Sequence, residues 1–281
     1  MKKIFSVLVA VIAYCSFSVA QVQTPDLSPR SKVEQKVGLT NFVLDYARPS
    51  VRDRKIMGEM VPFGEKWRTG ANKNSTISFD ATVVFGGKKV EAGEYAIFAK
   101  VEEKQWTIYI YNSTQNWGVP REWDEKLVVA AVKAPVNSLN QLQETFSIRF
   151  ENIQTDKFDL VFSWEKTTVS VPVELMTKDQ ALASIEKVMA GPSDRDYYLA
   201  AAFYHDQKME LELALEYITK AVEMRGVEAY WYTRKKALIE YELGDKKAAI
   251  ATAKQSLEAA KKANNAHYVK LNEESIKEWS R

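Results

Sequence analysis

The chain has 281 residues, a length typical of two domains, and its 46% hydrophobic and 27% charged content is that of an ordinary globular protein. Its 39 basic and 37 acidic residues nearly balance, so the basic excess that binds nucleic acid or anionic lipid is absent. No apolar run approaches the roughly 18 to 20 residues that span a bilayer. We therefore expect no nucleic-acid partner and no transmembrane segment.

Residues 1–20 form a predicted signal peptide. Two lysines at positions 2 and 3 precede a short apolar stretch, and residues 18–20 (Ser-Val-Ala) are the small residues that a signal peptidase recognises. We expect cleavage after Ala20, a mature chain that begins at Gln21, and export to the periplasm.

Cys15 is the only cysteine, and it allows an alternative in which the chain is an outer-membrane lipoprotein. Bacterial lipoprotein signals carry a small residue just before the lipidated cysteine, whereas Tyr14 occupies that position here. Cleavage after Ala20 leaves a mature chain without cysteine. Disulfides, thiol chemistry and thiolate metal sites are then excluded.

After a short linker at 21–30, residues 31–176 are predicted to form an antiparallel β-sandwich. Hydrophobic and polar residues alternate in several short stretches, as in 106–110 and 158–164, and this period of two is that of a strand. Eight or nine such strands with no helical pattern between them indicate a sandwich. Pro172 cannot donate to a sheet ladder, so we expect the last strand to lie at an edge.

Residues 47–75, which we call the arginine-rich loop, show no such alternation. Irregular connections of this length are uncommon in compact domains, and they are usually functional or disordered. Apolar residues such as Ile56, Val61 and Trp67 predict that the loop is folded onto the sandwich.

The motifs in and around this loop resemble a known family. They are Tyr46-Ala-Arg-Pro-Ser50, Val61-Pro-Phe-Gly64, Trp67-Arg-Thr-Gly-Ala-Asn72 and Ala92-Gly-Glu-Tyr95. This order is similar to domain of unknown function 2911, a family of exported bacterial proteins, and the resemblance covers roughly residues 25–173. It implies a domain, and the family has no established activity to transfer.

The candidate ligand-binding residues lie in or beside the loop: they are Tyr46, Arg48, Arg54, Trp67, Arg68 and Asn72. Guanidinium groups match carboxylate or phosphate oxygens, and aromatic faces stack on sugars or flat groups. This composition predicts a pocket for a small anionic or carbohydrate-like ligand. The alternative is that the arginines only hold the loop in place, through backbone carbonyls and carboxylates such as Asp45, Asp53 and Glu59.

Several chemistries are unavailable to the sandwich. Both histidines, His205 and His267, lie in the other half of the chain, which excludes serine–histidine and cysteine–histidine hydrolysis and histidine zinc sites. There is no glycine-rich phosphate loop, and we expect no metal and no cofactor. Glu122 and Asp124, beside two tryptophans, leave a carboxylate-dependent glycoside hydrolase as an alternative function. A solvated loop is the simpler interpretation of these two carboxylates.

From residue 177 onward the pattern becomes helical. Six amphipathic helices are predicted, at 178–189, 195–206, 210–225, 229–243, 246–263 and 266–279. Small residues recur with an offset of 35 in three pairs: Ala202 and Ala237, Ala214 and Ala249, Ala221 and Ser256. This resembles the tetratricopeptide repeat, whose period is about 34; a generic helical bundle is the alternative. The predicted fold class is thus α+β by segregated domains, with a sandwich followed by a tetratricopeptide-like array at 177–281.

In a tetratricopeptide hairpin the first helix lines a concave groove. The candidate partner-binding residues on those helices are Tyr198, Trp231, Arg234 and Lys235. Aromatic and arginine side chains are the usual anchors of protein contacts, so we expect a peptide or protein partner there. The leading hypothesis is an exported binding or scaffolding protein that is not an enzyme. The alternatives are the glycoside hydrolase and a purely structural envelope component.

Overall fold

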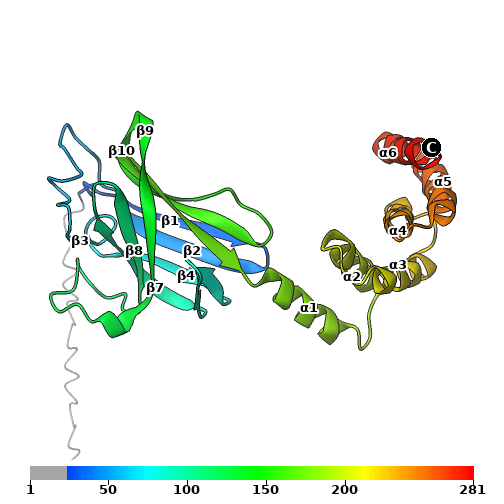
Figure 1. Ribbon diagram of the computed structural model, residues 1–281, viewed down its shortest axis with the longest axis horizontal. Helices are drawn as coiled ribbons and strands as arrows, with labels where there is room; N and C mark the ends of the chain where they lie inside the picture. Colours follow the sequence, from blue (N-terminus) through cyan, green and yellow to red (C-terminus); the bar gives the residue numbers. More distant parts are fainter. Residues whose placement is uncertain (1–23) are drawn as a thin grey trace, which may run out of the picture. The chain divides into compact units, whose positions relative to one another are not determined.

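The computed structural model describes residues 24–281, so the predicted signal peptide and Cys15 lie outside the described residues. The chain forms two compact units. Among the described residues, the first takes in 24–35, Asn41–Ile153 and Phe158–Val173, and the second takes in Lys36–Thr40, Gln154–Lys157 and Glu174–Arg281. An antiparallel sheet fills the first unit and helices fill the second (Figure 1), which confirms the α+β class with separate domains. No helix within residues 24–281 has the length and apolar content needed to cross a membrane.

Within the described residues, ten strands and one short 3-10 helix, η1 (Glu125–Leu127), lie wholly or mainly in the first unit. The strands are β1 (Arg30–Val37), β2 (Thr40–Ala47), β3 (Lys66–Trp67), β4 (Ser75–Phe79), β5 (Val83–Phe85), β6 (Lys88–Val90), β7 (Gly93–Val101), β8 (Gln105–Tyr111), β9 (Val128–Glu151) and β10 (Lys157–Leu175). They are ordered β1-β2-β4-β7-β8-β9-β10-β5-β6, and β3 pairs with β7. Trp106, Ile108 and Ile110 are buried, as their alternation predicts.

Two parts of this sheet pack face to face around an aromatic core, as in a sandwich. Phe42 of β2 lies 4.9 Å from Phe158 of β10, measured between ring centroids. Trp67 of β3 lies 5.0 Å from Phe146 of β9 and stacks on Trp164 of β10 at 5.6 Å. Such ring pairs add to the stabilisation from buried apolar area. The core therefore extends to the base of the arginine-rich loop, which contains β3.

The prediction that Pro172 marks an edge strand is wrong. Strand β10 lies between β9 and β5 in the sheet. Its register with β9 ends at the pair formed by Val169 and Val136. Pro172 lies beyond that pair and is exposed, so its missing N–H removes no hydrogen bond to β9.

The second unit contains six helices within the described residues. They are α1 (Thr177–Val188), α2 (Asp194–Asp206), α3 (Leu211–Arg225), α4 (Tyr230–Glu242), α5 (Lys246–Lys262) and α6 (Ala266–Trp279), and each packs on the next. All six predicted helices are confirmed to within one residue at each end. The N-terminus of α2 is fixed by a capping box between Ser193 and Asp196, and α5 begins at a second side-chain cap, Asp245.

Five of the six predicted small positions of the helical array are fully buried, namely Ala214, Ala221, Ala237, Ala249 and Ser256. The sixth, Ala202, is only partly buried, and its neighbour Ala201 takes the buried position on α2. The connection from α2 to α3 is one residue longer than that from α4 to α5. This extra residue shifts α2 by one position relative to the predicted offset.

Candidate functional site

The arginine-rich loop is folded onto the sheet, as the sequence predicts. Strand β3 pairs with β7 through Trp67 and Ala99, and Ser50 forms a bridge with Thr145 of β9. Ile56, within the loop, is fully buried. In Figure 1 the loop is the blue-to-cyan coil around β3. Its backbone is thus held at several points, which a binding site on a loop requires.

Three of the four arginines in this loop bind backbone carbonyls. Arg48 Nε donates to Phe146 O at 3.1 Å, and Arg52 Nη2 donates to Leu27 O at 2.6 Å. Arg54 donates from Nε to Val51 O at 2.9 Å and from Nη2 to Ser50 O at 2.6 Å. These three side chains therefore have the holding role that was the alternative interpretation of the loop.

Of the three carboxylates expected to share that role, Asp45 and Glu59 have other partners, and Asp53 is exposed. Asp45 pairs with Arg30 at 2.9 Å, and Glu59 pairs with Lys55 at 3.4 Å. The arginines of the loop are thus held through neutral carbonyl oxygens, and these contacts leave their positive charges without a neutralising carboxylate.

Arg68 differs from the other three arginines. Its side chain takes part in none of the hydrogen bonds and ion pairs found among residues 24–281, and its Nε atom is buried without an acceptor. Burial lowers the pKa of the Arg68 guanidinium from its usual value. A buried cationic donor without a partner is rare in native proteins and calls for an explanation such as a bound ligand.

The backbone next to Arg68 is strained and tightly held. Thr69 is fully buried with φ of 51°, an unusual conformation for a β-branched residue. Its Oγ1 donates to Ile97 O at 2.9 Å, and its carbonyl accepts from Ser75 Oγ at 2.6 Å. At Gly70, with φ of 151°, a Cβ would lie 2.8 Å from Ala47 O. Strain of this kind persists only where the surroundings enforce it, often at functional sites.

Arg68 lines a pocket of about 250 Å³, which we call the Arg68 pocket. Its wall consists of Leu27, Ser28, Pro49, Ser50, Arg52, Arg54, Met60, Val61, Trp67, Arg68, Gly70, Ala71 and Trp164. Three of these residues are arginines, two are tryptophans, and none of the described residues in the wall is acidic. The pocket is therefore electropositive, with an apolar surface beside the charge.

Trp164 is a pocket residue that sequence reasoning missed. Its indole is 1% exposed, and its Nε1 donor has no acceptor within residues 24–281. By contrast, Trp67 Nε1 donates to Gly70 O at 3.1 Å. A bulge follows Trp164 at Glu165, whose φ is 55° and whose Oε2 accepts from the Met57 amide at 3.3 Å. In the sequence Trp164 continues an alternating strand pattern, so it is indistinguishable from a core residue.

The other predicted loop residues lie elsewhere. Tyr46 and Arg48 line a second pocket of about 360 Å³, together with Arg149 of β9. The Tyr46 hydroxyl donates to Ile148 O at 3.1 Å. Asn72 is exposed and is not in the wall of the Arg68 pocket. The structure therefore brings together Arg54, Trp67 and Arg68, and it separates them from Tyr46, Arg48 and Asn72.

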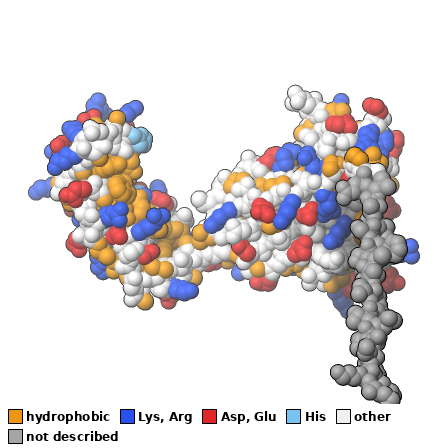
Figure 2. Space-filling view, turned by 180° about the vertical axis from the view of Figure 1, so that it is seen from behind, with side chains coloured by type: hydrophobic (Ala, Val, Ile, Leu, Met, Phe, Trp, Pro, Cys, Tyr) orange, Lys and Arg blue, Asp and Glu red, His pale blue; other side chains and the backbone are white. Residues whose placement is uncertain are grey.

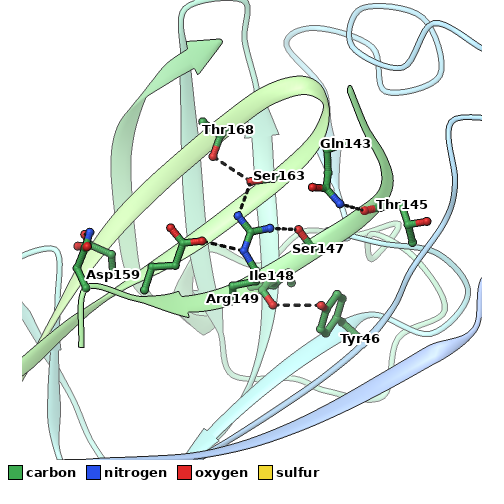
Figure 3. Close-up of polar contacts among 11 residues, drawn as sticks. Tyr46, Gln143, Thr145, Ser147, Ile148, Arg149, Asp159, Ser163 and Thr168 are labelled. Carbon is green, nitrogen blue, oxygen red and sulfur yellow. Dashed lines mark hydrogen bonds and ion pairs between the residues drawn. The ribbon is translucent and has the colours of Figure 1, made fainter. Parts of the chain in front are cut away.

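Arg149, one of the two arginines that line the second pocket, is fully engaged, as Figure 3 shows. Arg149 Nε donates to Glu151 at 2.8 Å, Nη2 donates to Ser163 Oγ at 3.3 Å, and Nη1 donates to Ser147 Oγ. Its charge is thus already balanced by a carboxylate. The other arginine of this pocket, Arg48, donates from Nε to Phe146 O. Both of its arginines therefore have hydrogen-bond partners, unlike Arg68.

Glu122 and Asp124 are both exposed, and neither lines the Arg68 pocket. Asp124 Oδ1 accepts from the Lys126 amide at 2.9 Å and caps η1. Asp124 is therefore the N-cap of η1, a common structural role for an acidic residue at the start of a helix.

The candidate residues of the helical unit contact one another or neighbouring helices. Tyr198 stacks on Tyr232 at 4.3 Å, and Trp231 is partly buried between Tyr230 and Tyr232. Arg234 donates to Asn272 Oδ1 at 3.0 Å and to Ser275 Oγ at 3.3 Å, and Lys235 donates to Asp206 at 3.1 Å. Figure 2 shows hydrophobic side chains gathered on one face of this unit, among charged ones.

Comparison with protein families gives one match. Residues 28–173 match the family described as Protein of unknown function (DUF2911), which covers more than half of the chain. No curated protein matches the sequence.

Proposed function

The chain belongs to the DUF2911 family of proteins of unknown function, and we propose that it binds a small anionic ligand in the Arg68 pocket. The observation that carries this proposal is the Arg68 side chain, which has no hydrogen-bond or ion-pair partner among residues 24–281 and whose Nε is buried without an acceptor. Three neighbouring arginines form hydrogen bonds that fix the loop, so a structural need for arginine is already met there. The Arg68 side chain forms no hydrogen bond that would fix the loop to another part of residues 24–281. It lines a pocket whose wall has no carboxylate.

An anion fits this pocket better than a neutral sugar. Sugar sites offer acceptors as well as donors to pair with ligand hydroxyls, and carboxylates are the usual acceptors. The charged wall residues here are all arginines, which donate and cannot accept. A guanidinium in a partly buried site binds carboxylate or phosphate oxygens through two parallel hydrogen bonds.

The pocket also limits the size of the ligand. Its volume of about 250 Å³ lies below the roughly 300–1,000 Å³ of sites for drug-sized molecules. The proposed ligand is therefore a small metabolite-sized anion, with room for only a short body beyond its charged group.

We propose further that the chain is exported, with cleavage after Ala20, and that it acts in the periplasm as a binding or scaffolding protein. The lysine pair, the short apolar stretch and the Ser-Val-Ala site support export. We also propose that the helical unit is an array of the tetratricopeptide type. The buried small residues Ala214, Ala221, Ala237 and Ala249 at the helix contacts support that assignment.

A thermal-shift screen of the mature chain, residues 21–281, tests the binding proposal. Sodium phosphate, acetate, butyrate and glucose are compared for wild type, Arg68→Met and Arg149→Met. Methionine keeps the apolar stem of arginine and removes its charge. We expect an anion to raise the midpoint of wild type and Arg149→Met but not of Arg68→Met, because losing the charged contact removes about 2–5 kcal/mol of binding free energy.

Arg149→Met is the control that separates the two pockets. If stabilisation disappears in Arg149→Met and persists in Arg68→Met, the ligand occupies the second pocket and the proposal is wrong. It is equally wrong if glucose alone stabilises the protein, or if both variants respond as wild type does.

A further inference from the structure

We infer that the ligand of the Arg68 pocket is a compact dianion, and that Arg52 and Arg54 bind it together with Arg68. This inference rests on the proposed function and adds the charge of the ligand and two further recognition residues. It starts from the charges in the pocket wall and from the groups that neutralise them.

The wall of the pocket holds three cations and no acidic residue. The cations are Arg52, Arg54 and Arg68, and none of them takes part in the ion pairs found among residues 24–281. A guanidinium group keeps its positive charge at neutral pH. A ligand with a single negative charge would leave most of this positive charge without a counter-ion.

Arg52 and Arg54 are fixed at the wall by neutral acceptors. Arg52 Nη2 donates to Leu27 O at 2.6 Å, and Arg54 Nη2 donates to Ser50 O, also at 2.6 Å. Leu27 and Ser50 themselves line the pocket. The two guanidinium groups are therefore positioned at the wall before a ligand binds, and such positioning reduces the entropy lost on binding.

These two arginines retain donors for a ligand. A guanidinium group has five N–H donors. Among the side-chain hydrogen bonds of residues 24–281, Arg52 uses one of these donors and Arg54 uses two. Both residues are exposed, so an anion that enters from solvent reaches them directly.

The outer end of the Arg68 guanidinium is accessible as well. Of its three nitrogens only Nε is buried without an acceptor, so Nη1 and Nη2 retain accessible surface. A Cβ added to Gly118 would lie 3.7 Å from Arg68 Nη1 and, apart from its chain neighbours, within 4 Å of no other atom. The space beside Nη1 is therefore open, and Arg68 can donate there to an anion that the two exposed arginines also contact.

The nearby carboxylates do not neutralise this wall. Glu144 Oε1 accepts from the Arg52 backbone amide at 2.9 Å, but it forms no ion pair with the Arg52 side chain. Asp53 lies between Arg52 and Arg54 in the chain and is exposed. Neither acidic residue lines the pocket, so the positive charges of the wall face the ligand without an acidic group among them.

The volume of about 250 Å³ requires the two charges to lie on a small body. A tetrahedral oxyanion with two charges and a short dicarboxylate both meet this requirement, and guanidinium groups bind the oxygens of either. The inference is therefore the charge of the ligand, and the experiment distinguishes the two chemical sources.

The test is a calorimetric titration of the mature chain with two pairs of ligands that are similar in shape and differ by one charge. Sulfate is paired with methyl sulfate, and succinate with its monoamide, succinamate. We expect a dianion to bind at least tenfold more tightly than its monoanion, because its second charge meets further cations. This preference in the sulfate pair identifies a tetrahedral oxyanion, and in the succinate pair a dicarboxylate.

Arg54→Met tests the contribution of an exposed arginine, since methionine keeps the apolar stem and removes the charge. We expect most of the preference for the dianion to disappear, while the monoanion still binds through Arg68. Arg54→Lys restores a charge and should restore part of the preference. Arg121→Met is the matched control, because Arg121 is exposed and lies outside the pocket wall; it should bind both ligands as wild type does.

Should the Arg54 variants fail to fold, the salt dependence of wild type gives the second measurement. A tenfold increase in ionic strength should weaken binding of the dianion more than that of the monoanion, because more charge pairs are screened. Equal weakening of both ligands overturns the assignment of several arginines to the site.

The outcomes also separate this inference from the proposed function. If dianion and monoanion bind wild type equally in both pairs and Arg68→Met abolishes their binding, the inferred charge is wrong and anion binding stands. A preference for the dianion that is as large in Arg54→Met as in wild type overturns the role of Arg54. If Arg68→Met binds every anion as wild type does, both proposals fail together.

Discussion

The two units of this protein use their buried cations differently. In the helical unit, Arg234 is partly buried and bound to Asn272 and Ser275 of α6, and Lys235 is bound to Asp206 of α2. In the sheet unit, Arg68 is also partly buried, yet it has no partner among residues 24–281. Burial lowers the pKa of both guanidinium groups from their usual values.

This difference shows that burial alone does not identify a binding residue. A buried arginine with a full set of internal partners stabilises the fold, and its donors are not free for a ligand. A buried arginine without partners is unfavourable in the unliganded protein and gains its partners when an anion binds. The comparison therefore predicts that removing the hydrogen bonds of a partnered arginine lowers stability, whereas replacing an unpartnered arginine weakens ligand binding and leaves stability nearly unchanged.

The largest effect is expected at the buried polar network of the helical unit. Asn272 is fully buried; it accepts from Arg234 and donates to Ser256 Oγ and to Tyr268 O, both at 2.9 Å. Asn272→Ala removes these bonds and leaves Arg234 without its main acceptor. We expect the free energy of unfolding to fall by about 2–4 kcal/mol, measured by urea denaturation followed at 222 nm.

Glu273→Ala is the control for this substitution, because Glu273 is the exposed neighbour of Asn272 on the same helix. If Asn272→Ala costs no more than Glu273→Ala, the hydrogen bonds of Arg234 contribute little. Arg234 would then be available to a partner, as the sequence suggests, and the contrast between the two units would disappear.

A smaller effect is expected for an arginine that holds the arginine-rich loop. Arg48 Nε donates to the carbonyl of Phe146, a fully buried residue of β9. Arg48→Met leaves this acceptor unpaired, and we expect a loss of about 1–3 kcal/mol in the stability of the sheet unit. Indole fluorescence during denaturation measures it, and Arg121→Met, at an exposed arginine, provides the baseline. Equal stability of the two variants would show that the carbonyl contact is dispensable.

The sequence predicted the scaffold better than the site for a physical reason. Periods of two and 3.6 residues reflect burial, which is repeated along each element, so strands such as β8 and all six helices were recognisable. Hydrogen-bond partners are not periodic, and they join residues far apart in the chain. The sequence could place Arg48, Arg54 and Arg68 in one loop, but it could not show that Arg68 alone lacks a partner.

Trp164 illustrates the same limit. It follows Phe158, Leu160 and Phe162 in an alternating pattern, and the pattern correctly places it in the core. Its contribution to the pocket depends on how the arginine-rich loop, some hundred residues earlier, lies against β10. Ala202 was misplaced for a related reason, because one additional residue between α2 and α3 moves the buried position to Ala201 without changing the composition.

The smallest expected effect on stability is at Arg68 itself. It decides whether this arginine holds the loop in place or binds a ligand. Arg68→Met should leave the free energy of unfolding of the unliganded protein within about 0.5 kcal/mol of wild type. The substitution removes no hydrogen bond and no ion pair among residues 24–281, and the methionine retains the packing of the stem. A small increase in the free energy of unfolding also agrees with a ligand-binding role, because the variant has no unpaired charge to desolvate on folding.

The measurement is urea denaturation in a buffer without small carboxylates or phosphate, so that no anion occupies the pocket. A loss above about 1 kcal/mol, similar to that of Arg48→Met, would mean that Arg68 also holds the loop in place. The two units would then use their buried arginines in the same way, and the Arg68 pocket would lose its free cation.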